Sequence, residues 1–147
     1  MNRLNDDVTK ALKLSMKAHA GQRDKAGEDY FLHPLTVAFT LAKNGYSDDC
    51  IATALLHDVV EDTDYTLTDL MEMGFSKTIT EALALLTHDK TVPYMDYVKN
   101  LKDNPIARAV KMSDLMHNSD LSRLKDITES DRMRVEKYKR SMEILKE

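Results

Sequence analysis

Three short segments of the sequence carry side chains that can hold a metal ion. His57 and Asp58 are adjacent and follow the apolar run at positions 51–56, where burying an imidazole beside a carboxylate needs compensation from a cation. His33 lies in an earlier segment and Asp114 in a later one. Together they offer two nitrogen and two oxygen ligands, a mixed set that suits one divalent transition ion with water in its open positions.

Two further carboxylates follow the His-Asp pair. Glu61 and Asp62 lie four residues beyond His57 and Asp58, so each would be one turn beyond its partner if a helix continued. A metal lowers the pKa of a bound water, and a nearby carboxylate can accept the proton as that water attacks. The alternative reading is a solvated acidic loop beside a packing histidine, because an isolated His-Asp pair recurs by chance. Here the pair does not stand alone.

Composition restricts the class of protein. The chain has 147 residues, of which 42% are hydrophobic and 31% charged, which predicts a single domain over residues 1–147. Its 21 basic and 25 acidic residues are well mixed and give a net charge of −4, so we expect no nucleic-acid partner. No apolar run reaches the roughly 20 residues of a membrane span, and Cys50 has no partner for a disulfide. We therefore expect a cytoplasmic protein with no membrane association.

The elements that must position these residues are helices. Apolar residues recur at helical spacing and rarely alternate with a period of two, which predicts an all-α fold of about seven or eight helices. We expect the first to run from about Leu4 to before Gly21, and the second to begin at Pro34. Further helices are expected to begin at capping residues, namely Ser47, Thr66 with Asp69 as a capping box, Ser76, Asn104 before Pro105, and Thr128. The helix after Asn104 would place Asp114 and Asn118 on one face.

At this point the sequence resembles a known family. Phe-Leu-His-Pro-Leu around His33, Leu-Leu-His-Asp-Val-Val-Glu-Asp-Thr at 55–63 and Lys-Met-Ser-Asp-Leu-Met-His-Asn at 111–118 look like the signature of HD-domain metal-dependent phosphohydrolases, in the form found in RelA/SpoT-type alarmone hydrolases. The order and spacing agree from about Ala18 to Asn118. The resemblance implies a compact helical bundle of the HD type.

The resemblance also implies roles for individual residues. It makes His33, His57, Asp58 and Asp114 the metal ligands, gives Glu61 and Asp62 the task of positioning and activating the attacking water, and assigns Asn118 to the substrate nucleoside. The ion would be manganese, Mn²⁺. The reaction would remove pyrophosphate from the 3′ position of guanosine tetra- or pentaphosphate.

The remaining histidines bear on the number of metal ions. Dinuclear HD enzymes need further histidine ligands between His-Asp and the final aspartate, and only His88 lies between Asp58 and Asp114. We therefore expect a mononuclear site. His19 is expected to pack in the core or anchor a loop, and His117 to lie beside the ligands without joining them.

The resemblance is weakest around Asp24. The alarmone hydrolases usually have a basic residue there that is important for the guanine base, and here Arg23 and Lys25 flank a carboxylate instead. We expect Arg23 and Lys25 to contact the substrate, with base recognition weakened or passed to Arg23.

Two other functions stay open. One is hydrolysis of another nucleotide, such as a nucleoside monophosphate or a phosphorylated dinucleotide, by the same metal chemistry. The other is a non-catalytic nucleotide-binding module, against which the water-activating pair Glu61 and Asp62 argues. The sequence does not decide whether the chain forms a homo-oligomer.

Overall fold

The computed structural model describes residues 6–147, and this part of the chain folds into α-helices with no β-strand beyond an isolated bridge between Arg23 and Asp29. The prediction of an all-α fold is confirmed. The helices are α1 (Asp6–Ala18), α2 (Leu32–Lys43), α3 (Asp48–Leu56), α4 (Val59–Asp62), α5 (Leu67–Glu72), α6 (Lys77–Leu86), α7 (Tyr94–Leu101), α8 (Pro105–Asn118) and α9 (Glu129–Lys146). The one-turn α4 raises the count above the predicted seven or eight, and Leu4 lies outside the described residues.

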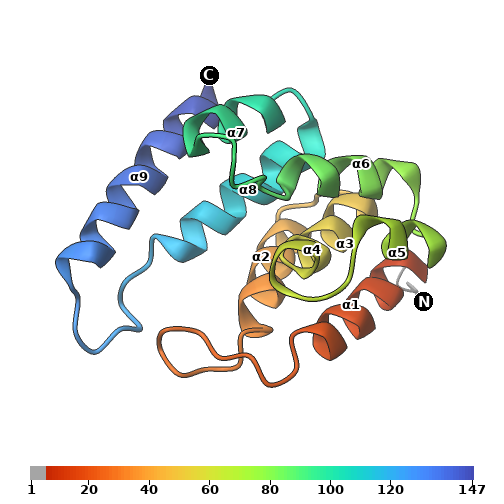
Figure 1. Cartoon of the computed structure of the whole chain (residues 1–147), viewed down its shortest axis with the longest axis horizontal. Helices are drawn as coiled ribbons and strands as arrows, with labels where there is room; N and C mark the ends of the chain where they lie inside the picture. Colours follow the sequence, from red (N-terminus) through yellow and green to blue (C-terminus); the bar gives the residue numbers. More distant parts are fainter. Residues whose placement is uncertain (1–5) are drawn as a thin grey trace.

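Helix α3 lies at the centre of the bundle (Figure 1). It packs against α1, α2, α6 and α8, and six of its nine residues are buried, from Cys50 to Leu56. A helix that is apolar on nearly every side must be surrounded by others, which explains its position. Helix α9 packs on α7 and α8 at the edge of the molecule. Within residues 6–147, no helix is long and apolar enough to cross a membrane.

The predicted helix starts are largely confirmed. The side chains of Ser47, Thr66, Ser76, Asn104 and Thr128 each accept a hydrogen bond from a backbone N–H of the first turn. Thr66 with Asp69, and Thr128 with Asp131, form complete capping boxes. These local bonds satisfy N–H groups that the helix itself leaves without partners.

Helix α2 is the exception, because it begins at Leu32, two residues before Pro34. A turn precedes it, in which the N–H of Leu32 donates to the carbonyl of Asp29 at 3.1 Å. Pro34 still lies in the first helical turn, where a missing N–H costs no intrahelical bond. The earlier start places His33 inside α2 and fixes its backbone.

The chain between α3 and α4 interrupts the helix at His57 and Asp58 without leaving the helical path. Asp58 has φ −103° and ψ −2°, and its carbonyl accepts the N–H of Asp62 at 2.9 Å. The expected one-turn relation between Asp58 and Asp62 therefore holds across the break.

Candidate metal centre and adjoining pockets

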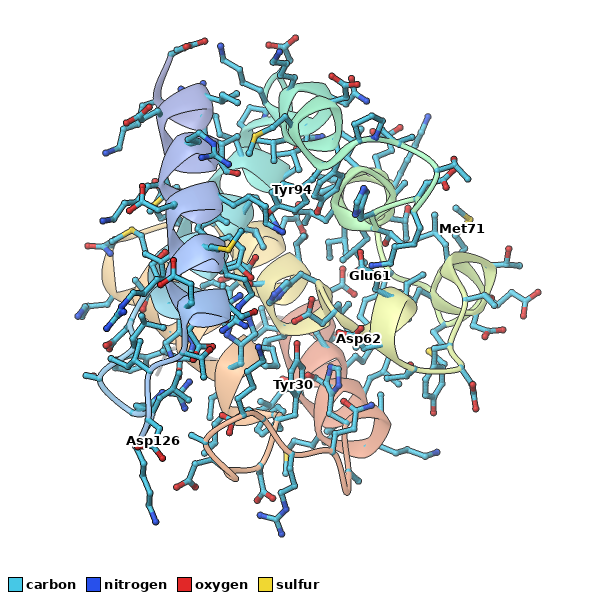
Figure 2. The ribbon with its side chains drawn as sticks, turned by 60° about the vertical axis from the view of Figure 1, so that its left-hand side comes forward. Tyr30, Glu61, Asp62, Met71, Tyr94 and Asp126 are labelled. Atoms are coloured by element: carbon cyan, nitrogen blue, oxygen red, sulfur yellow. The ribbon has the colours of Figure 1, made fainter. Side chains whose placement is uncertain are left out.

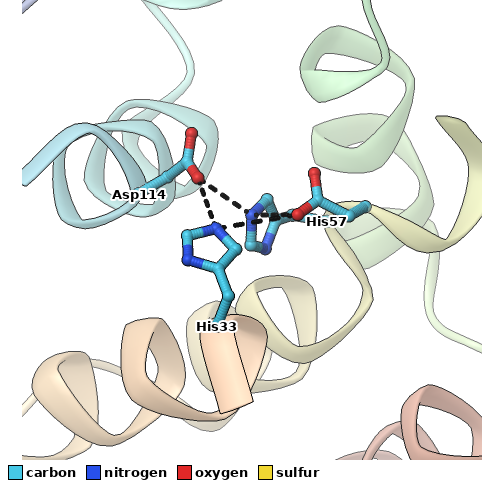
Figure 3. Close-up of side chains that lie close together, drawn as sticks. His33, His57 and Asp114 are labelled. Atoms are coloured by element: carbon cyan, nitrogen blue, oxygen red, sulfur yellow. Dashed lines mark hydrogen bonds and ion pairs between the residues drawn. The ribbon is translucent and has the colours of Figure 1, made fainter. Parts of the chain in front are cut away.

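Four side chains from three parts of the bundle converge beside α3. His33 Nε2 lies 2.7 Å from Asp114 Oδ1, and His57 Nε2 lies 3.3 Å from the same oxygen (Figure 3). Asp58 Oδ2 is 3.1 Å from His57 Nε2. One nitrogen or oxygen from each of the four residues lies within 4.8 Å of the others. The structure thus brings together all four residues that the resemblance implied as ligands.

The rings are oriented by bonds on their far sides. His57 Nδ1 lies 2.6 Å from the carbonyl of Ala54, so Nδ1 carries the proton and Nε2 is turned to the cluster. His33 Nδ1 lies 2.7 Å from Nδ1 of His117, so His117 lies beside the predicted ligands. Such outer bonds fix the tautomer of a metal-binding imidazole and its direction.

The charges around the cluster favour a cation. Burial opposes a charged His57, but the carboxylates of Asp58 and Asp114 outweigh this and hold its pKa well above the usual value. Burial likewise raises the pKa of Asp114, yet Lys111 and the hydrogen bonds from His33 and His57 bring it well below its normal range. The same two carboxylates, one buried and one half-buried, also attract a metal cation. With two nitrogen and two oxygen donors, the cluster fits a divalent metal.

Lys111 supports Asp114 from the same helix. Its Nζ lies 3.0 Å from Asp114 Oδ2, which leaves Oδ1 for the histidines. The ammonium also lies over the rings of Tyr94 and Tyr97, at 5.6 and 5.2 Å from their centroids. Burial works against its charge, but Asp114 and the two phenols hold the pKa of Lys111 well above its usual value. The i,i+3 spacing of Lys111 and Asp114 is the sequence signal for this contact.

Tyr30 is a site residue that the sequence interpretation missed. Its hydroxyl donates to Asp58 Oδ2 at 2.6 Å and lies 3.4 Å from Asp62 Oδ2. It therefore links a predicted ligand to a predicted catalytic carboxylate. Figure 2 shows Tyr30 near Asp62. Burial, followed by the charges of Asp58 and Glu61, raises the pKa of Asp62. Nothing in the sequence near Tyr30 indicated that contact, because Asp58 is 28 residues away.

Glu61 is held from the opposite side of the site. Its Oε1 accepts the backbone N–H of His88 at 2.6 Å, which joins α4 to the loop after α6. Asp58, Glu61 and Asp62 also offer carboxylate oxygens within 4.8 Å of one another. The two predicted catalytic carboxylates therefore lie next to the cluster, one on the Tyr30 side and one on the His88 side.

His88 itself does not belong to either group of possible ligands found among residues 6–147. Its Nε2 lies 2.7 Å from the carbonyl of Val92 within its own loop. We predict that His88→Ala retains a full complement of one bound ion per chain, because the variant keeps the backbone N–H that reaches Glu61. Elemental analysis of the metal-loaded protein measures this. Two ions in the wild type, or an empty site in the variant, would make the mononuclear assignment wrong.

Two adjoining pockets open beside the cluster and share Tyr30, Asn118 and Tyr138. The first, of about 370 Å³, is called the metal-side pocket and is lined by the carboxylates of Asp58, Glu61, Asp62 and Asp114 together with Lys90, Lys111 and Lys137. The second, of about 300 Å³, is called the arginine pocket and is lined by Arg23, Arg123 and Arg134 with apolar groups such as Leu121 and Leu124. One continuous ligand can therefore contact both.

The two pockets differ in whether their positively charged side chains have carboxylate partners. In the arginine pocket each guanidinium has a carboxylate partner, Arg23 with Asp29, Arg123 with Asp24 and Arg134 with Asp131. In the metal-side pocket Lys111 pairs with Asp114, whereas neither Lys90 nor Lys137 forms a salt bridge to any residue between 6 and 147. Lys137 instead lies 4.4 Å from the centroid of the Tyr94 ring. Burial, and then the neighbouring cations led by Lys111, lower its pKa.

The predicted substrate residues all line the arginine pocket. Asn118 also lines the metal-side pocket, and its Nδ2 donates to Asp114 Oδ1 at 3.1 Å. Lys25 lies 3.9 Å from Asp131 at the start of α9. Asp24 is not a free carboxylate in the pocket, because its Oδ2 accepts a hydrogen bond from Arg123 at 3.1 Å.

Comparison with known proteins agrees with this architecture. A family model described as HD domain matches residues 11–112. A guanosine-3′,5′-bis(diphosphate) 3′-pyrophosphohydrolase from Aquifex aeolicus is 30% identical over 77% of this chain and 17% of its own length. A probable enzyme of the same name from Mycoplasma pneumoniae is 39% identical over 54% of this chain and 11% of its own length. A probable GTP pyrophosphokinase from Mycobacterium leprae is 32% identical over 76% of this chain and 15% of its own length. The chain thus spans less than a fifth of the length of these curated relatives.

A solved structure described as a metazoan ortholog of SpoT that hydrolyses ppGpp has the same fold, with a TM-score of 0.79 and 22% identity over 99% of this chain and 88% of that one. The region matched by the family model includes α2 and α3 with His33, His57 and Asp58, and it ends two residues before Asp114. Because both the sequence of these helices and the side chains they bring together fit the same family, this chain belongs to the HD domain family.

Proposed function

We propose that this chain is a metal-dependent phosphohydrolase that removes pyrophosphate from the 3′ position of guanosine tetra- and pentaphosphate. The observation that carries the proposal is the distribution of charge between the two pockets. The metal-side pocket combines two of the clustered carboxylates, Asp58 and Asp114, with Lys90 and Lys137, which have no carboxylate partner among residues 6–147. In the arginine pocket, by contrast, each guanidinium is paired with a carboxylate. A guanosine with a 3′ diphosphate has a strongly anionic end and a flat, uncharged base, and these match the two pockets respectively.

The cations of the metal-side pocket suit a diphosphate. Lys137 and Lys90 extend toward the same space as the ammonium of Lys111. Because Lys90 and Lys137 have no carboxylate partner among residues 6–147, phosphate oxygens can pair with them without displacing an existing salt bridge. Asn118 and Tyr138 lie where the pockets meet and would contact the ribose.

His33, His57, Asp58 and Asp114 would hold the ion, and we propose manganese as its identity. When bound, such an ion lowers the pKa of water and neutralises charge on phosphoryl oxygens. Glu61 and Asp62 would position the attacking water and accept its proton. Tyr30 would keep Asp62 beside the cluster through its contacts with both carboxylates. The products would be GDP from the tetraphosphate, GTP from the pentaphosphate, and pyrophosphate.

The names of the relatives support this substrate, and so does the SpoT ortholog, whose structure this chain matches over nearly its whole length. The relatives are much longer, and one is named for a GTP pyrophosphokinase activity. The cluster of possible metal ligands beside Glu61 and Asp62 supports the hydrolase activity rather than the kinase activity.

The test is a product assay with purified chain and manganese. Guanosine tetraphosphate is compared with guanosine pentaphosphate, nucleoside monophosphates and a phosphorylated dinucleotide, and the products are separated by ion exchange. We expect the tetraphosphate to yield equimolar GDP and pyrophosphate. Faster turnover of another nucleotide would favour the second candidate function that the carboxylate of Asp24 suggested. Tight nucleotide binding without turnover would indicate the non-catalytic module.

A further inference from the structure

One guanidinium of the arginine pocket, that of Arg123, pairs with a carboxylate from a distant part of the chain. Arg23 and Arg134 pair with Asp29 and Asp131, which lie six and three residues away in the same loop or helix. Arg123 instead pairs with Asp24, 99 residues away, on the loop between α1 and α2. Its own loop connects α8 to α9, and the two loops lie at the same edge of the molecule (Figure 1).

Asp24 is a firm anchor because its carboxylate is bound at both oxygens. Oδ1 accepts the backbone N–H groups of Ala26 and Glu28 at 2.9 and 3.0 Å, and Oδ2 accepts Nη1 of Arg123 at 3.1 Å. Burial works against its charge, but these hydrogen bonds and the guanidinium lower the pKa of Asp24. The side chain is 14% exposed, whereas that of Arg123 is 41% exposed. The anchor is therefore covered while the guanidinium remains accessible from the pocket.

Arg123 has donors left over for a ligand. A guanidinium carries five N–H groups, and Asp24 is the only acceptor that Arg123 reaches among residues 6–147. Apolar groups from Ala26, Leu121 and Leu124 line the same pocket, with the ring of Tyr138 at its boundary. An aromatic base fits such surroundings, and the remaining donors of Arg123 would meet its polar edge.

We propose that Arg123, held in place by Asp24, determines base specificity by donating hydrogen bonds to the acceptor edge of guanine. The inference rests on the proposed function, because it assigns the nucleoside to the arginine pocket. Guanine presents two acceptors, O6 and N7, on one edge, whereas adenine replaces O6 with an amino donor. A guanidinium can only donate, so it favours guanine and leaves the adenine amino group opposite another donor. Asp24 thus contributes to base recognition indirectly, through the side chain that it holds.

Equilibrium binding tests this without relying on turnover. GDP and ADP are titrated into the manganese-loaded chain by calorimetry. We expect the wild type to bind GDP roughly tenfold or more tightly, the ratio expected for a good guanidinium–guanine pair. Arg123→Ala should bring the ratio of the two dissociation constants close to one. Arg123→Lys keeps the positive charge without the fork of donors and should recover only part of the preference.

Two matched variants separate this role from a structural one. Asp24→Asn keeps the acceptor for Ala26 and Glu28 but loses the charge that holds Arg123, so the preference should fall with the turn intact. Arg23→Ala removes a guanidinium from the same pocket and should weaken GDP and ADP binding equally. An unchanged GDP preference in Arg123→Ala, or a wild type that binds neither nucleotide or both alike, overturns the inference. If the GDP preference depends on Arg123 but the chain does not hydrolyse the alarmone, the inference about Arg123 holds and the proposed function is refuted.

Discussion

Alanine at any one of His33, His57, Asp58 or Asp114 is expected to abolish tight binding of a divalent ion and, with it, hydrolysis. Each substitution removes one of the four donors that cluster among residues 6–147. Loss of an outer partner alone weakens metal affinity by roughly 10–100-fold, so loss of a direct ligand should exceed that. Calorimetric titration with manganese and elemental analysis after desalting give the two measurements.

Asp114→Asn is the most informative single variant. It preserves the shape of the side chain and an oxygen, but it removes the charge that both histidines and Lys111 contact. Asp126→Asn is its control, because Asp126 is exposed in the loop before α9 and lines neither pocket. Circular dichroism must show that each variant is folded, since Asp114→Asn leaves a buried ammonium without its carboxylate. A folded Asp114→Asn that binds manganese as tightly as the wild type would refute the assignment.

The features that the sequence predicted well are those set by local chemistry. Thr66 with Asp69 and Thr128 with Asp131 are three residues apart, and a capping box needs nothing from the rest of the chain. The start of α2 was misplaced because Pro34 tolerates the third helical position as well as the first, and the deciding bond comes from a turn at Asp29. A helix of a single turn, such as α4, is too short to show a periodic apolar pattern, so the sequence did not predict it.

The candidate site residues also divide into those placed by local spacing, which the sequence predicted, and those placed by long-range contacts, which it did not. The i,i+4 relations of His57 to Glu61 and of Asp58 to Asp62 keep the two carboxylates near the cluster, and the order of the motifs predicted which four residues cluster. The contact between Arg123 and Asp24 joins two loops far apart in sequence, where no periodic pattern acts. The sequence therefore indicated only that a carboxylate at Asp24 weakens base recognition or passes it to Arg23, whereas in the structure Asp24 pairs with Arg123.

Outer contacts such as these matter for the chemistry because they limit how the cluster can move. Tyr30 and Lys111 bind oxygens of Asp58 and Asp114, while His117 and the carbonyl of Ala54 bind the far sides of the two histidines. Because each clustered side chain has a further partner, contacts within the protein orient the donor atoms toward one another. The two carboxylates of α4 are held in the same way, and their effect on rate can therefore be tested apart from metal binding.

Glu61→Gln and Asp62→Asn are expected to retain the metal and to lower kcat by roughly 10²–10⁴, the usual cost of losing a general base. Glutamine keeps an oxygen that can accept the N–H of His88, and asparagine keeps one near Tyr30, so both preserve local geometry. What each removes is the capacity to accept a proton from the attacking water. Steady-state kinetics with guanosine tetraphosphate, together with metal content, measures the two effects separately.

Asp64→Asn is the matched control, because Asp64 is exposed two residues beyond Asp62 and lines neither the metal-side nor the arginine pocket. It should leave kcat unchanged. KM should change little in Glu61→Gln and Asp62→Asn, since the lysines and the arginine pocket that would bind the nucleotide are intact, and a fall confined to kcat identifies an interaction made in the transition state. If both variants turned over at nearly the normal rate with metal bound, neither carboxylate could be the proton acceptor, and the base would have to be another group lining the metal-side pocket.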